Sequence, residues 1–222
     1  MQFAQLYPIL YRILKPSFPD CLWSGKTNSR AIALTFDDGP HLQYTPELLQ
    51  VLDRFSISAS FFWLGACVDR APSIARDVYR RGHCIGLHGY DHRSFPFLKS
   101  DELKLSLEKT QKAIAQACQI HPESIRDVRP PNGLFTPQTL TLLHQWNYQP
   151  VMWSVVPEDW ERPGVSVVVQ RVLQQVRNGS IIVLHDGYFG GKDVAETTAQ
   201  LVPQLLQKGY HFVTIDQLWQ QI

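Results

Sequence analysis

The chain has 222 residues, which suits one domain or at most two small ones. A chain of this length buries roughly 70% of its unfolded surface, so it needs no disulfide or metal to fold. Hydrophobic residues make up 44% and charged residues 18%, which excludes a disordered chain. The net charge of +1 argues against a nucleic-acid binder, which usually carries a basic excess. Aromatic residues reach 11%, which indicates a large core or, as a sharper alternative, the wall of a sugar-binding pocket.

The four cysteines, at positions 21, 67, 84 and 118, form no C-x-x-C pair, so neither a zinc ribbon nor a thioredoxin-like site is predicted. The N-terminal segment lacks an early positive charge and a small-residue cleavage site, so no secretory signal is predicted. Its apolar stretch is also too short to span a bilayer. We therefore expect reduced core cysteines and a cytoplasmic protein without a transmembrane segment. An interfacial helix with peripheral membrane association is the alternative for this segment.

Taken in chain order, apolar runs that predict strands alternate with amphipathic segments that predict helices. The predicted strands cover residues 31–36, 58–64, 84–87, 127–129, 148–154, 180–184 and 210–214. The predicted helices cover residues 45–55, 72–81, 100–119, 136–146, 165–177, 193–208 and 216–221, and two of them open with a Thr-Pro pair at Thr45 and Thr136. This alternation predicts a parallel sheet covered by helices. About seven strands favour a closed or nearly closed barrel, and an open doubly wound sheet is the alternative.

Ionisable residues stand at the C-terminal ends of five predicted strands, and that face of a parallel barrel carries the active site. One such ending is ordinary loop chemistry, but five on one face are difficult to explain by solvation alone. The endings, in chain order, are Asp37-Asp38, His88 with His92, Arg129, Asp159-Trp160 and His185-Asp186.

Two of these endings predict a metal site. The pairs Asp37-Asp38 and His88-x-x-x-His92 could be a solvated turn and two unrelated surface imidazoles. Taken together, however, Asp38, His88 and His92 offer two nitrogens and one oxygen. Three protein ligands leave an open coordination position, which is typical of a catalytic metal site. Zn²⁺ suits these ligands, and other divalent transition metals could replace it.

The remaining ionisable residues are either candidates for the functional site or structural residues. Arg129 is either a surface charge or, beside a carboxylate at a strand end, the group that positions that carboxylate. His185 is either a core histidine or a general acid. His41 stays undecided between the two classes. Four more histidines lie away from the cluster and are interpreted as structural: His83, His121, His144 and His211.

The motifs at these strand ends resemble, in order and spacing, the five motifs of the polysaccharide deacetylase (NodB-homology) family. They are Thr35-Phe-Asp-Asp-Gly-Pro40, His88-Gly-Tyr-Asp-His92, Arg129-Pro-Pro-Asn-Gly133, Trp153 with Asp159-Trp160, and Ile182-Val-Leu-His185. The resemblance spans roughly residues 30 to 215. It implies a distorted (β/α) barrel that works as a metal-dependent N-deacetylase. The expected organisation is a lead-in segment over residues 1–29 followed by a catalytic domain over residues 30–222.

The resemblance also implies the roles of the first three motifs. Asp37 would be the general base. Asp38, His88 and His92 would hold one divalent metal ion, with Zn²⁺ the first expectation. Arg129 would orient the base.

The last motifs complete the expected site. The backbone N–H of Asn132 would help to hold the oxyanion, and Trp160 would form a wall of the groove. His185 would be the general acid with Asp159 as its partner, and Leu184 would line the pocket for the acetyl methyl group.

Two positions depart from the pattern of the family and put the substrate in doubt. Val156 stands where the family often has an acid, and Asn132 stands where it often has an aromatic residue. The expected reaction is removal of N-acetyl groups from an amino-sugar polymer or oligomer, such as a chitooligosaccharide or a peptidoglycan-like chain. A small intracellular amide or a lipid-linked sugar is the enzymatic alternative. A non-catalytic sugar-binding barrel is the third possibility.

Overall fold

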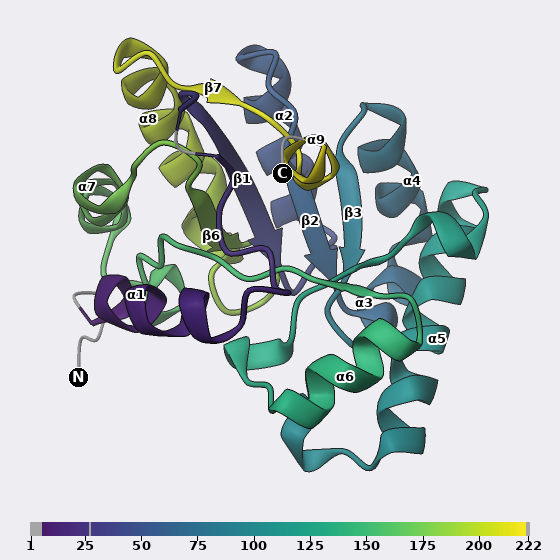
Figure 1. Cartoon of the computed structure of the whole chain (residues 1–222). Helices are drawn as coiled ribbons and strands as arrows, with labels where there is room; N and C mark the ends of the chain where they lie inside the picture. The colour runs from purple at the N-terminus through teal and green to yellow at the C-terminus, as the bar shows by residue number, and fades with distance from the viewer. Residues whose placement is uncertain (1–5, 27, 221–222) are drawn as a thin grey trace.

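The computed structural model describes residues 6–26 and 28–220, and within these ranges seven strands form one sheet. Every pair of neighbouring strands is parallel, in the order β5-β4-β3-β2-β1-β6, with β7 also beside β1 (Figure 1). The strands are β1 (Ala31–Asp37), β2 (Ser60–Trp63), β3 (Cys84–Leu87), β4 (Asp127–Val128), β5 (Gln149–Pro150), β6 (Ile181–His185) and β7 (His211–Phe212). The C-terminal ends of the strands therefore all lie at one edge of the sheet, as the arrowheads of β1, β2 and β3 show in Figure 1.

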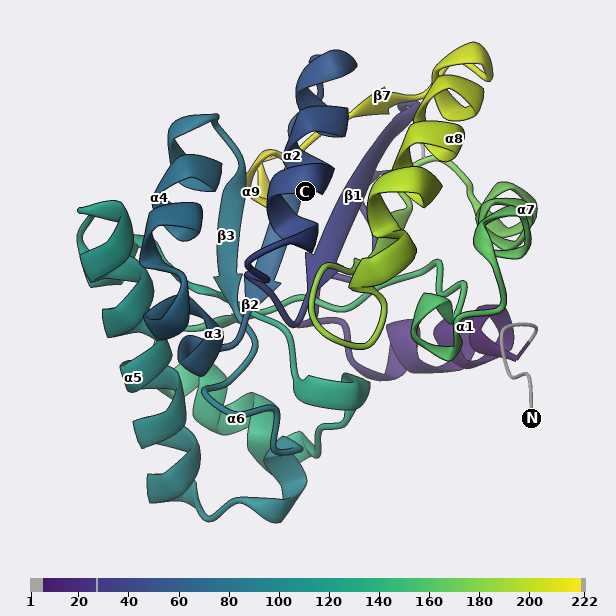
Figure 2. The ribbon, with the colours of Figure 1, turned by 180° about the vertical axis from the view of Figure 1, so that it is seen from behind.

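Helices occupy most connections between the strands, as the sequence predicts. They are α1 (Tyr7–Ser17), α2 (Tyr44–Arg54), α3 (Gly65–Arg70), α4 (Pro72–Arg80), α5 (Ser100–Cys118), α6 (Pro137–Gln145), α7 (Val165–Gln175), α8 (Val194–Gln207) and α9 (Ile215–Trp219). Figure 2 shows α2, α4 and α8 in front of the sheet, where they cover its outer face. Helix α1 lies near the C-terminal edge of the strands (Figure 1).

Alternate residues of β1 enter two different apolar clusters, because successive side chains of a strand point to opposite faces. Ile32, Leu34 and Phe36 belong to the large cluster that includes the apolar residues of α2 and α8. Ala33 belongs to a smaller cluster on the other face, together with Leu22. Asp37 follows the same alternation, so its side chain is directed to the inner face of the curled sheet.

The sheet curls until the segment before β1 bridges its two ends. Leu22 pairs with Val151, just after β5, and Ser24 pairs with Ser180, just before β6. Val155 also pairs with Ile182 of β6. The result is a curled parallel sheet that forms a half-barrel. This confirms the predicted distorted barrel and not its alternative, an open doubly wound sheet.

Some predicted boundaries are wrong at the level of single elements. Thr45 does not cap α2, which begins one residue earlier. Its buried hydroxyl accepts a hydrogen bond from the backbone N–H of His41 and donates one to the Asp186 carboxylate. Thr136, by contrast, does cap α6 and accepts a hydrogen bond from the backbone N–H of Thr139. The strand at β5 is shorter than predicted, and helix α3 was not predicted.

No helix among the described residues is both long enough and apolar enough to cross a bilayer. The four cysteines are free thiols; Cys21 and Cys118 are buried, as expected, whereas Cys67 and Cys84 are only half-buried.

The bridging segment makes a testable contribution to stability. Trp23 is buried, and its indole N–H donates to the carbonyl oxygen of Phe18 at 3.0 Å. We expect Trp23→Ala to lower the free energy of unfolding by about 3–5 kcal/mol, because it leaves a cavity where the barrel closes. Leu10→Ala on the exposed face of α1 is the control and should change it by less than about 0.5 kcal/mol. Urea denaturation checks both values, and equal losses would show that Trp23 does not seal the barrel.

Candidate active site

The register of the sheet brings the predicted site residues together. Asp37 at the end of β1 pairs with His185 at the end of β6. Leu87 of β3 pairs with Val128 of β4, so His88 and Arg129 leave neighbouring strands at the same level. Residues distant in the sequence therefore meet at one edge of the sheet.

Arg129 and Asp37 form a buried ion pair at the centre of this edge. One guanidinium nitrogen of Arg129 donates to Asp37 Oδ1 at 2.5 Å and to the hydroxyl of Thr35 at 2.8 Å. Another donates to the carbonyl oxygen of Met152 at 3.1 Å, and the group lies 4.0 Å from the ring centre of Phe62. Arg129 is wholly buried, and its guanidinium contacts the Asp37 carboxylate directly.

The ionisation of this pair reflects burial first and pairing second. Burial raises the pKa of the Asp37 carboxyl, and the charges of Arg129 and His185 oppose that rise. Burial likewise lowers the pKa of Arg129, while Asp37 opposes the shift. A carboxylate with a raised pKa is a stronger proton acceptor than an ordinary aspartate.

Asp38 turns away from its neighbour because its backbone is left-handed, with φ of 74°. This conformation is uncommon for a residue other than glycine and is concentrated at functional sites. Its Oδ1 lies 3.4 Å from Nε2 of His88 and 3.2 Å from Nε2 of His92. Among the described residues these three form the one cluster of His, Cys, Asp or Glu whose ligand atoms all lie within 4.8 Å of one another.

The donor set of this cluster fits a divalent metal ion. Asp38 Oδ1 is buried and has no hydrogen-bond partner within the described part of the chain, which is costly unless a cation meets it. His88 Nδ1 lies 2.7 Å from the carbonyl oxygen of Arg129, so it donates there and leaves the lone pair of Nε2 free. Burial lowers the pKa of His88 to about 3, which keeps the ring neutral, as a metal ligand must be.

His185 and Asp159 form the second charged pair of the edge. Asp159 Oδ1 lies 2.9 Å from Nδ1 of His185, and Oδ2 accepts the backbone N–H of His185 at 2.8 Å. Burial disfavours the imidazolium, but the carboxylates of Asp159, Asp38 and Asp37 outweigh it and raise the pKa of His185 to about 10. His185 is therefore protonated at neutral pH. Its Nδ1–H donates a hydrogen bond to Asp159, so Nε2–H is the donor that remains for another group.

These groups open into one groove of about 520 Å³. Its lining includes all three residues of the metal cluster together with Asp37, His185, Asn132 and Trp160. The groove is also lined by four residues for which no groove position was predicted: Tyr7, Trp153, Val183 and Phe189. Val156 contributes a buried apolar wall at the position where the family often has an acid. Asn132 has a left-handed backbone, with φ of 59°, and its amide donates to the hydroxyl of Ser94 at 2.8 Å.

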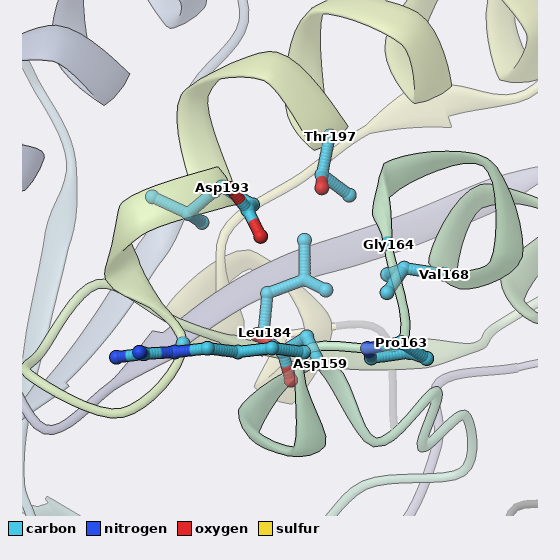
Figure 3. Close-up of a pocket in the computed structure, with 10 residues that line it drawn as sticks. Asp159, Pro163, Gly164, Val168, Leu184, Asp193 and Thr197 are labelled. Carbon is cyan, nitrogen blue, oxygen red and sulfur yellow. The ribbon is translucent and has the colours of Figure 1, made fainter.

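Leu184 does not line this groove, which corrects the sequence prediction. It is directed to the outer face of β6, into a separate small pocket beside Val168 and Thr197 (Figure 3). Val183 lines the groove instead, because alternate residues of a strand point to opposite faces and His185 already points inward. The alternation was available in the sequence and could have identified Val183.

Asp186 is a buried residue of this edge for which no role was predicted. Its carboxylate accepts a hydrogen bond from the hydroxyl of Thr45 and fills the space that a side chain at Gly39 would need. Burial raises the pKa of Asp186 to about 7, with the nearby Asp38 carboxylate adding to the shift. Asp186 therefore fixes the turn that follows Asp38 against helix α2.

Two further histidines have clear structural positions. His83 is buried, its Nδ1 accepts the backbone N–H of Ala59 at 3.1 Å, and burial lowers its pKa to about 4. His41 stacks on Tyr44 at 4.0 Å and accepts the backbone N–H of Gln43. His83 is thus a core residue, as expected, and His41 supports the start of α2.

Comparison with known proteins identifies the family. A family model described as polysaccharide deacetylase matches residues 24–151. A peptidoglycan-N-acetylglucosamine deacetylase of Bacillus cereus is 34% identical over 204 residues, which cover 88% of this chain and 91% of that protein. The chain belongs to the polysaccharide deacetylase family. A chitooligosaccharide deacetylase of Azorhizobium caulinodans is 35% identical over 196 residues, which cover 82% of this chain and 91% of that protein.

A solved structure extends the likeness to the fold. The Bc1960 peptidoglycan N-acetylglucosamine deacetylase, crystallised with a hydroxamate, superposes with a TM-score of 0.85 at 30% identity. The match covers 91% of this chain and 94% of that one. The relatives are hydrolases that act on N-acetyl amide bonds, and the family resemblance in the sequence is confirmed.

The metal cluster yields a direct test. We expect His88→Ala and His92→Ala each to lose bound metal, because either change leaves only two protein ligands. Elemental analysis of the purified protein measures the metal content per chain. His121→Ala, on the exposed surface, is the matched control and should keep full occupancy. Full occupancy in both cluster variants would contradict the assignment.

Proposed function

We propose that this chain is a metal-dependent N-deacetylase that hydrolyses N-acetyl groups on an amino-sugar polymer or oligomer. The observation that carries the proposal is the convergence of three parts on one groove. These parts are the Asp37–Arg129 pair, the Asp38–His88–His92 cluster and the His185–Asp159 pair.

Asp38, His88 and His92 would hold one divalent ion, for which Zn²⁺ is the first candidate. When bound there, the ion supplies Lewis acidity, which polarises an amide carbonyl and makes water acidic enough to react near neutral pH. The cluster lies in the groove that would receive the acetamido group.

Asp37 would act as the general base and accept a proton from the attacking water. Its carboxylate is held in one orientation by Arg129, and its raised pKa favours proton uptake. The backbone N–H of Asn132 would donate to the oxygen that becomes negative as water adds to the carbonyl carbon. Asn132 lines the groove and has the left-handed backbone described above.

His185 would act as the general acid. An amine leaves badly as an anion, so the C–N bond breaks only as its nitrogen receives a proton. Asp159 keeps the imidazole charged until that moment, and Nε2 is the atom that would donate. Protonation of the leaving nitrogen by His185 would release acetate and a free amino sugar.

The walls of the groove suit a sugar ring with an acetamido group. Trp153 and Trp160 present aromatic faces and edges, against which sugar C–H groups pack well. Val183 would contact the acetyl methyl group in the place first assigned to Leu184. The open groove favours an oligomer or polymer over a small amide, which needs no extended surface.

The substrate class is tested by acetate release. Purified protein loaded with Zn²⁺ should release acetate from N-acetylglucosamine oligomers or from peptidoglycan fragments, and a chelator should abolish the release. The His88→Ala variant is the matched negative control. Acetate release from small amides alone, with none from any amino-sugar oligomer, would overturn the proposed substrate class.

Asp37→Asn separates metal binding from turnover. The amide is nearly isosteric with the carboxylate but cannot accept the proton of water, so we expect turnover to fall by about 10²–10⁴-fold. Metal content should stay at the wild-type level, because Asp37 is not in the metal cluster. A near wild-type rate in Asp37→Asn would assign the general base elsewhere.

The pH profile tests the acid. Turnover requires protonated His185, so it should fall as pH rises through the raised pKa of that residue, near 10. Asp159→Asn removes the main charge that raises the pKa, so the alkaline limb should move to lower pH. An alkaline limb that stays in place would show that His185 is not the titrating acid.

A further inference from the structure

The outer face of helix α1 is unusual because large aliphatic side chains cover it. Leu6, Ile9, Leu10 and Ile13 have exposed fractions of 48%, 54%, 45% and 59%. Their spacing of three, four and seven residues places them on one stripe of the helix. A single exposed leucine is ordinary, but a contiguous apolar stripe marks an interaction surface.

The opposite face of α1 is already occupied by the barrel. Tyr11 and Leu14 pack against the main core cluster, and Lys15 donates hydrogen bonds to Tyr11 and Ser24. The orientation of the helix is therefore fixed, with one apolar face inward and the other outward. A helix that is apolar on both faces is normally covered on both.

The stripe adjoins the candidate active site. Tyr7 of α1 lines the groove and meets Trp153 edge-on at 5.7 Å and Trp160 at 6.5 Å. A second segment at the same groove, between β6 and α8, exposes Tyr188 and Phe189 by 70% and 64%. Phe189 itself lines the groove. Two segments that border one groove thus present apolar side chains to solvent.

The size and charge of α1 distinguish between possible partners. The outer face of an eleven-residue helix is only about 16 Å long. The four half-exposed side chains of the stripe fall short of the roughly 800 Å² that a stable protein interface uses on each partner, so the stripe alone does not hold a second copy. The helix carries no acidic residue, and its exposed Arg12 complements an anionic surface.

We propose that α1 is an interfacial anchor that lies in the headgroup region of a membrane containing anionic lipid. The stripe Leu6, Ile9, Leu10 and Ile13 enters the boundary of the acyl chains, and Tyr188 and Phe189 add a second contact. The groove is then held at the bilayer surface. The second part of the inference rests on the proposed function: the substrate is an N-acetylated amino sugar that a lipid holds at that surface.

Vesicle sedimentation tests the anchor without using activity. Wild-type protein should sediment with vesicles of phosphatidylcholine and phosphatidylglycerol. The triple variant Ile9→Ser, Leu10→Ser, Ile13→Ser should bind at least about tenfold more weakly, because aliphatic burial is the main attraction. The matched control carries the same kind of change on helices away from the stripe, at Leu105→Ser and Leu206→Ser, and should bind like wild type. Arg12→Gln should weaken binding to anionic vesicles but leave binding to pure phosphatidylcholine unchanged.

The two parts of the inference fail in different ways. The anchor is overturned if wild type stays in the supernatant, or if the triple variant sediments like wild type. It is also overturned if analytical ultracentrifugation finds a wild-type dimer that the triple variant converts to monomer, because a second copy would then cover the stripe. Acetate release from a lipid-linked amino sugar in vesicles tests the substrate part. The triple variant should release acetate from this substrate at least about tenfold more slowly than wild type. It should act on soluble oligomers at the wild-type rate. Equal slowing on both substrates would overturn the substrate part, whereas no release from either by wild type would instead contradict the proposed function.

Discussion

The buried guanidinium of Arg129 is the interaction on which the candidate site depends. The guanidinium donates hydrogen bonds to Asp37 and Thr35 on β1 and to carbonyl oxygens of the segment after β5. The backbone carbonyl of Arg129 accepts a hydrogen bond from Nδ1 of His88. Through its side chain and its backbone, this one residue thus joins Asp37, the Asp38–His88–His92 cluster and the wall of the barrel. A buried charge is tolerated only when its partners are in place, so the geometry of the site and the closure of the barrel depend on each other.

The adjacent carboxylates of Asp37 and Asp38 contact different partners because the backbone directs them apart. Asp37 is the last residue of β1 and keeps the alternation that directs it toward Arg129. Asp38 has left the strand with a left-handed backbone, which turns its carboxylate toward His88 and His92. The close approach of Asp186 to Gly39 explains why no side chain is tolerated just after this turn.

The sequence predicts well what local rules decide and less well what tertiary contacts decide. Strand β3 and the cap at Thr136 follow from local patterns, and the five strand endings locate the site edge because parallel strands bring their ends together. Thr45 resembles a cap locally, but its hydroxyl donates a hydrogen bond to the carboxylate of Asp186, 141 residues later. Tyr7 could not be placed in the groove from sequence, because its position depends on where α1 packs after the barrel closes.

Asp37 and His185, which we propose as base and acid, are both buried but have partners of opposite charge. Both Asp37 and His185 end neighbouring strands at one register level, and burial disfavours the charged form of each. Arg129 supplies a positive partner for the aspartate, and Asp159 supplies a negative partner for the histidine. In the proposed mechanism, a carboxylate that accepts a proton and an imidazolium that donates one would therefore face the same groove. The parallel register places them at one level of the sheet, and each partner opposes the effect of burial on its own group.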